Sequence, residues 1–74
     1  MKAVEAMREI MRSKGVSIAA LAGRVSAKPN TITQRLSQPN ISIDKLNEML
    51  RVLDYKVVVV PREARIPDGG YEVE

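Results

Sequence analysis

The stretch Ser17-Ile-Ala-Ala-Leu-Ala-Gly-Arg-Val-Ser-Ala-Lys-Pro-Asn-Thr-Ile-Thr-Gln-Arg-Leu36 decides the fold of this chain. Ser17 is a natural N-cap for a short helix from residue 18 to about residue 25, whose small side chains let another helix approach closely. Residues 26–28 form a turn. Pro29 then suits the first position of a helix over 29–37, because its missing N–H has no helical partner there. The stretch therefore predicts two short helices joined by a tight turn.

The second helix of this pair has little apolar surface to bury. Ile32 and Leu36, four positions apart, form one narrow apolar stripe, and the other side chains are mostly polar. Such a helix is held by its neighbours and leaves its outer face free for another purpose. Two short helices of this kind, with a polar outer face on the second, match the plan of a helix-turn-helix DNA-binding unit.

Helices are also predicted on both sides of the pair. Residues 2–14 carry apolar side chains at helical spacing, and Gly15 suits the left-handed residue that closes a helix. Ser42 caps a fourth helix over 43–53, which has the most regular apolar period in the chain. The methionines are expected to fill the core as aliphatic side chains. Spacing assigns to the core Leu21, Val25, Ile32, Leu36, Leu46, Leu50 and Leu53.

The period changes at Val57-Val58-Val59-Val60, four consecutive β-branched residues that predict a strand apolar on both faces. A lone strand in a helical domain leaves its edges unpaired, so we expect it to pair with the same strand of a second copy across a two-fold axis. Pairing with residues 71–73 of its own tail, through a turn at 68–70, is the alternative. The rest of the tail from residue 62 is expected to be flexible.

Composition excludes several classes of function. The chain has 74 residues, enough for one domain, and contains neither Cys nor His. Disulfides, cysteine-ligated zinc and histidine-based catalytic triads are therefore impossible, and we expect no enzyme, no metal and no cofactor. No apolar run is long enough for a signal sequence or a membrane-spanning helix, so we expect a soluble cytoplasmic protein with no membrane partner.

Charge is distributed unevenly along the chain. Residues 1–40 carry seven basic and two acidic side chains, whereas residues 41–74 carry five basic and seven acidic ones. Between Glu9 and Asp44 there is no acid, although five basic residues lie there. A surface that is basic, free of acids and rich in Ser, Thr, Asn and Gln is what a phosphate backbone requires. The alternative is a solvated basic face with no partner.

The pair of helices resembles the Xre, or λ-repressor-like, helix-turn-helix family. The matching positions are the Ser17 cap, Leu21-Ala22, Val25 before the turn and Thr31-Ile32-Thr33-Gln34 after it. The run from 38 to 60 looks like HipB-type antitoxins and related small regulators, in which the strand pairs between subunits. The chain departs from the family pattern in three places: Ser26 stands where glycine is usual, Ile18-Ala19-Ala20 where acidic or Gln residues are common, and Lys28 where Ser or Thr usually caps the second helix.

The resemblance implies a mainly α fold, a four- to five-helix λ-repressor-like helix-turn-helix domain with one C-terminal β-strand that pairs across a homodimer. Residues 1–55 would be the DNA-binding domain, 56–61 the dimerisation strand and 62–74 a flexible tail. The helix after the turn would enter the major groove, where amide side chains can bond adenine bidentately and a threonine methyl can pack on thymine.

Candidate site residues follow from this reading, each with ordinary solvated surface as the alternative. The DNA base contacts are Lys28, Asn30, Thr31 and Gln34, with Lys28 open between a guanine and a phosphate. The phosphate contacts are Ser17, Arg24, Thr33, Arg35, Gln38, Asn40 and Lys45. The dimer interface is expected to contain Tyr55, Val57, Val58, Val59 and Val60.

Two functions are therefore predicted. The first is a sequence-specific transcriptional regulator, a repressor, that binds double-stranded DNA with an inverted repeat as a homodimer. The second is an antitoxin-type interaction module that neutralises a partner toxin through the tail 62–74, which contains four acids and would fold on the partner. The two are compatible, because antitoxins of this type also repress their own promoter.

Overall fold

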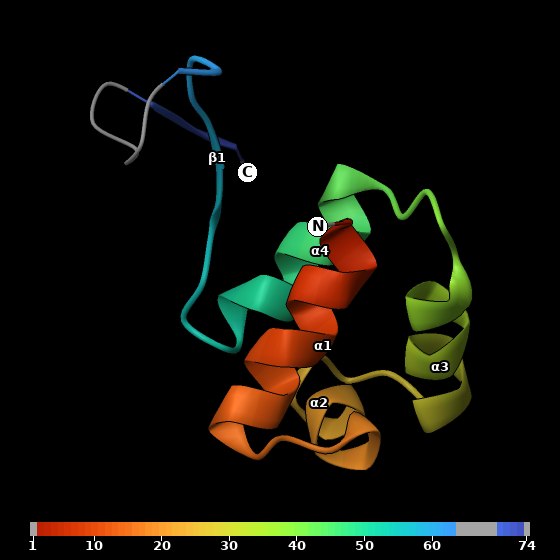
Figure 1. Ribbon diagram of the computed structural model, residues 1–74. Coiled ribbons are helices and arrows are strands. Elements are labelled where there is room, and N and C mark those ends of the chain that lie inside the picture. The colour runs from red at the N-terminus through yellow and green to blue at the C-terminus, as the bar shows by residue number, and fades with distance from the viewer. Residues whose placement is uncertain (1, 64–69, 74) are drawn as a thin grey trace.

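The computed structural model describes residues 2–63 and 70–73, which form four helices followed by two short strands (Figure 1). The prediction of a small, mainly α domain is confirmed, and each helix begins and ends within two residues of its predicted bounds. In chain order the elements are α1 (Ala3–Lys14), α2 (Ile18–Arg24), α3 (Pro29–Ser37), α4 (Ile43–Arg51), β1 (Val57–Val59) and β2 (Tyr71–Val73).

The core is aliphatic and receives a large side chain from every helix. Met7 from α1, Leu21 from α2, Ile32 from α3 and Met49 from α4 are all fully buried, and Leu53 joins them just beyond α4. Most of the predicted core residues are buried, whereas Val25 and Leu46 are partly buried and pack against the others. The core thus lies where the four helices meet, and it is filled without any aromatic ring.

Three of the helices end in the same backbone turn. Gly15, Ser26 and Asp54 adopt left-handed φ angles of 66°, 57° and 63° shortly after α1, α2 and α4. At each turn the N–H of the next residue donates to the carbonyl five positions back, as from Ala27 to Ala22 at 2.9 Å. This pattern satisfies carbonyls that the helix end would otherwise leave unpaired. The turn between α2 and α3 therefore has the geometry that favours glycine, although Ser26 occupies it.

The strand after α4 has a partner within its own chain. β1 and β2 form an antiparallel pair in which Val57 lies opposite Val73, Val58 opposite Glu72 and Val59 opposite Tyr71. The expectation of a single C-terminal strand is wrong, because the chain has two, and the alternative partner, residues 71–73, is the one that pairs with β1 within the chain. The strand ends at Val59 rather than Val60. In Figure 1 the hairpin stands at one side of the helical body.

Part of the predicted tail over 62–74 belongs to this hairpin. Residues 71–73 are in a strand, and Gly70 precedes it at a close approach to β1. A Cβ at Gly70 would lie 2.6 Å from Cγ1 of Val60 and 2.7 Å from Cγ1 of Val58, so only glycine fits there without a shift. The expected turn at 68–70 falls mostly outside the described residues, as does the segment 64–67.

Within residues 2–63 and 70–73, no helix is long and apolar enough to cross a membrane.

Candidate nucleic-acid interface

Helices α2 and α3 are the two short helices that the sequence predicts on either side of a tight turn. The Oγ atom of Ser17 accepts a hydrogen bond from the backbone N–H of Ala20 at 3.1 Å, so Ser17 caps α2 as expected. Leu21 and Ala22 on α2 are buried. The small Ala22 lets α3 pack closely against α2, and Leu36 is buried near the other end of α3. The polar helix α3 is therefore positioned mainly by its neighbours.

The four predicted base-contact residues lie at the N-cap and in the first two turns of α3. Lys28 is the N-cap, and Pro29 is the first helical residue. Lys28, Asn30 and Gln34 are exposed, and Thr31 is half-buried. Asn30 and Gln34 are four positions apart and share one face of the helix. Within the described part of the chain, no side-chain hydrogen bond involves Lys28, Asn30 or Gln34, so their polar groups are available to a ligand.

Two other polar side chains of α3, Thr33 and Ser37, differ, because their hydroxyls bond to the backbone of the same helix. Thr33 donates its hydroxyl hydrogen to the carbonyl of Pro29 at 3.1 Å, and Ser37 donates to the carbonyl of Thr33 at 2.7 Å. These bonds to the carbonyl four positions back hold both hydroxyls along the helix. A phosphate contact from Thr33 would then use its remaining acceptor oxygen or a rotated hydroxyl, which makes Thr33 the weaker candidate.

Arg35, one of the predicted phosphate contacts, has a carboxylate partner within the protein. Its Nη1 lies 2.7 Å from Oε1 of Glu48 on α4, and only 16% of the Arg35 side chain is exposed. Sequence reasoning missed this pair because Glu48 lies beyond the acid-free stretch that contains Arg35. The fold brings the acid back against that stretch.

The other predicted phosphate contacts are exposed. They come from both ends of α2, from the loop after α3 and from the first turn of α4. Ser42 caps α4 by accepting a hydrogen bond from the backbone N–H of Lys45 at 3.2 Å. The side chain of Lys45 is exposed to solvent. Figure 1 places α3 on the opposite side of the molecule from the hairpin. The exposed residues are Ser17, Arg24, Gln38, Asn40 and Lys45.

The predicted dimer residues lie on or beside the hairpin and are unevenly exposed. Val57 and Val58 are half-buried, whereas 55% of Val59 and 37% of Val60 are exposed. Tyr55 is 45% exposed, and Nζ of Lys14 lies 5.6 Å from the centre of its ring. That cation–π contact ties the end of α1 to the segment before β1.

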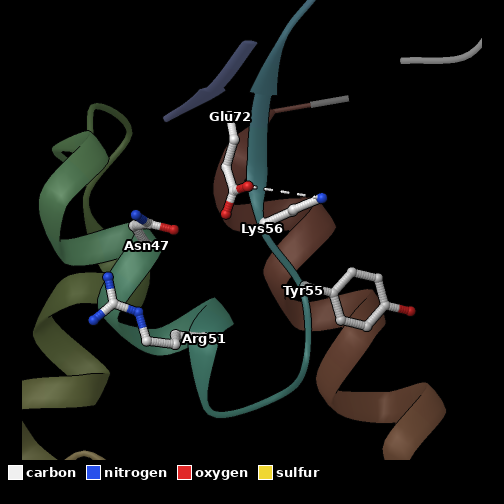
Figure 2. A pocket seen from close by; sticks show the side chains of 5 residues that line it. All are labelled: Asn47, Arg51, Tyr55, Lys56 and Glu72. Atoms are coloured by element: carbon white, nitrogen blue, oxygen red, sulfur yellow. Dashed lines mark ion pairs between the residues drawn. The ribbon is translucent and has the colours of Figure 1, made fainter. Parts of the chain in front are cut away.

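Asn47 is a buried polar residue that the sequence reading did not single out. Only 6% of it is exposed, and its Nδ2 donates to the carbonyl of Val73 at 2.9 Å, so it attaches β2 to α4. Beside it lies a hollow of about 260 Å³. Figure 2 shows the five side chains that line this hollow, with the amine of Lys56 3.8 Å from the Glu72 carboxylate. The lining residues are Asn47, Arg51, Tyr55, Lys56 and Glu72.

No metal site stands out in the part of the chain that the structure describes, where no three acidic side chains come together. With neither Cys nor His in the sequence, the remaining donors are carboxylates, hydroxyls and amides. The exposed amides, hydroxyls and basic side chains around α3 offer hydrogen bonding and charge attraction.

Comparison with known proteins adds no assignment: no family model, no curated protein and no solved structure matches this chain.

Proposed function

We propose that this protein is a sequence-specific DNA-binding transcriptional regulator of the λ-repressor-like helix-turn-helix type, and that it represses by binding an inverted-repeat operator as a homodimer. The observation that carries the proposal is the exposed, internally unbonded polar start of α3, held against α2 by a tight turn. An ordinary surface helix also exposes polar side chains. What favours a groove-reading helix is that two amide side chains, Asn30 and Gln34, share one face, because amides can bond adenine bidentately in the major groove.

In this proposal the first turns of α3 enter the major groove. Asn30 and Gln34 bond adenine N6 and N7, and the methyl group of Thr31 packs against thymine. Lys28, at the N-cap, reaches a guanine or a phosphate. Exposed basic and polar side chains on α2, on the 38–42 loop and on α4 contact the sugar–phosphate backbone and set the orientation of the protein.

The homodimer is proposed to form through the hairpin. A two-stranded hairpin still has an unpaired edge on each of its strands, and such an edge readily pairs with another chain. Val59 and Tyr71 lie opposite each other and are 55% and 75% exposed, so joining two hairpins would remove apolar surface from water. Because α3 lies on the other side of the molecule, this contact leaves both recognition helices free.

Selection of binding sites from a random duplex library at moderate salt tests the proposal. We expect enrichment of an inverted repeat with half-sites about 34 Å, or one helical turn, apart. Gln34→Ala should weaken the selected site by about 1–3 kcal/mol and relax preference at one base pair. Weak, salt-sensitive retention of all sequences without enrichment would contradict sequence-specific binding.

The same hairpin supports the antitoxin-type module as a second candidate function. Its apolar residues Val59 and Tyr71 are 55% and 75% exposed. The hairpin stands on the opposite side of the molecule from α3 (Figure 1). In this version a partner toxin docks on the hairpin, which is already folded at 71–73. Deletion of 62–74 should then abolish partner binding. The helix-turn-helix unit should still bind a duplex that contains one half-site, because a single subunit can occupy it without the hairpin contact.

A further inference from the structure

The C-terminal half of α3 is held by two arginine contacts. Nη2 of Arg8 on α1 donates to the carbonyl of Leu36 at 3.4 Å, and Nη1 of Arg35 donates to Oε1 of Glu48 at 2.7 Å. The buried residues of α3 are Ile32 and Leu36, which lie in one narrow stripe along the helix. Such a narrow apolar contact resists rotation of α3 about its own axis only weakly. The two arginine contacts attach the end of this helix to α1 and to α4, and so restrict its rotation.

The pair Arg35–Glu48 differs from the other short ion pair of the helices. Arg12 and Glu9 lie three positions apart within α1, at 2.6 Å, with 78% and 54% of their side chains exposed. Arg35 and Glu48 join two helices, and 16% of the Arg35 side chain and 50% of the Glu48 side chain are exposed, so the two pairs differ in the burial of the arginine and not of the carboxylate. An exposed local pair contributes little, because water and salt screen it, whereas a partly buried guanidinium depends much more on its carboxylate.

We propose that Glu48 is a specificity-determining positioning residue, which holds Arg35 so that α3 keeps one angle and so that this guanidinium does not bind phosphate. The inference rests on the proposed function as a DNA-binding protein, and it replaces the prediction that Arg35 is itself a phosphate contact. Glu48 needs no contact with DNA for this role. It acts through Arg35, on the helix that carries Asn30 and Gln34.

Loss of the carboxylate has two consequences that point in opposite directions. The freed guanidinium of Arg35 becomes available to the phosphates of DNA of any sequence. Each bound subunit then makes one more phosphate contact, so its affinity for non-specific DNA rises. The helix α3 also loses its ion pair with α4 and keeps only the apolar contacts of the core with that helix, so the alignment of its base-reading residues weakens. The ratio of specific to non-specific affinity therefore falls in either case.

The test compares Glu48→Gln with Glu9→Gln, which removes the same charge from an exposed ion pair on α1. Binding to a random-sequence duplex is measured from 50 to 200 mM salt, with folding of each variant checked by urea denaturation. One added phosphate contact corresponds to about a threefold steeper loss of affinity over that range for each bound subunit. We expect this for Glu48→Gln and not for Glu9→Gln. The double variant Glu48→Gln with Arg35→Gln should return to the wild-type slope.

The outcomes separate the inference from the function on which it rests. If the wild-type protein binds no duplex at any salt, the proposed function is wrong and the inference is overturned with it. If the wild-type binds and both single variants have its salt slope, Glu48 does not restrain Arg35 and only the inference is overturned. If Arg35→Gln alone lowers the slope by one contact, Arg35 binds phosphate in the native protein, which also overturns it.

Discussion

The helical body and the C-terminal hairpin are held together in different ways. The body has fully buried side chains from four helices, so its stability is distributed over many apolar contacts. The hairpin contributes only partly buried valines and is attached to α4 by the Asn47 hydrogen bond, with one ion pair at 3.8 Å beside it. Single substitutions should therefore affect the two regions on different scales, globally in the body and locally in the hairpin.

The largest expected effect is on the body, from Leu21→Ala. Leu21 is fully buried on α2, and truncating a buried leucine costs about 2–5 kcal/mol. In a domain of this size that is a large part of the total stability. Urea denaturation should show the loss, and Ile43→Ala, at a position that is 51% exposed, serves as the control with a change of about 0.5 kcal/mol or less. If Leu21→Ala and Ile43→Ala lowered the free energy of unfolding equally, the stability of the helical body would not come mainly from its buried core.

The core of the body could be predicted because apolar periodicity reports it directly. Residues such as Ile32 and Leu36 recur at the helical period, and each is buried where the spacing puts it. The caps at Ser17 and Ser42 are equally local, since each hydroxyl bonds an N–H three residues later. Local signals of this kind need no knowledge of the tertiary fold.

The partner of the strand and the partner of Arg35 could not be predicted in the same way. Four consecutive valines indicate a strand but not which strand lies beside it, and residues 71–73 carry too short a pattern to compete with a second copy. Glu48 meets Arg35 only because α4 folds back against α3. Counting charges along the sequence does not detect such a contact.

Asn47→Ala should produce an intermediate effect confined to the hairpin. The substitution leaves the carbonyl of Val73 without its donor and removes a buried amide, which costs about 1–2 kcal/mol. Hydrogen exchange should show faster exchange at the amides of β1 and β2, with the α1–α3 amides unchanged. Asn40→Ala, an exposed amide in the loop before α4, is the matched control. If the helices lose protection to the same degree, the hairpin and the body unfold as one unit and the contrast between them is wrong.

The smallest expected effect is a gain in the body, from Ser26→Gly at the turn of the helix-turn-helix unit. Ser26 has φ 57°, and an L-residue in this left-handed conformation is less stable than glycine by about 1 kcal/mol. Gly15 is the internal control, because it occupies the same kind of turn at φ 66°, so Gly15→Ser should cost about as much as Ser26→Gly gains. Thermal or urea unfolding measures both changes. Opposite signs would show that the α2–α3 turn carries removable backbone strain, whereas a loss from Ser26→Gly would mean that the serine side chain stabilises the turn by more than its strained backbone costs.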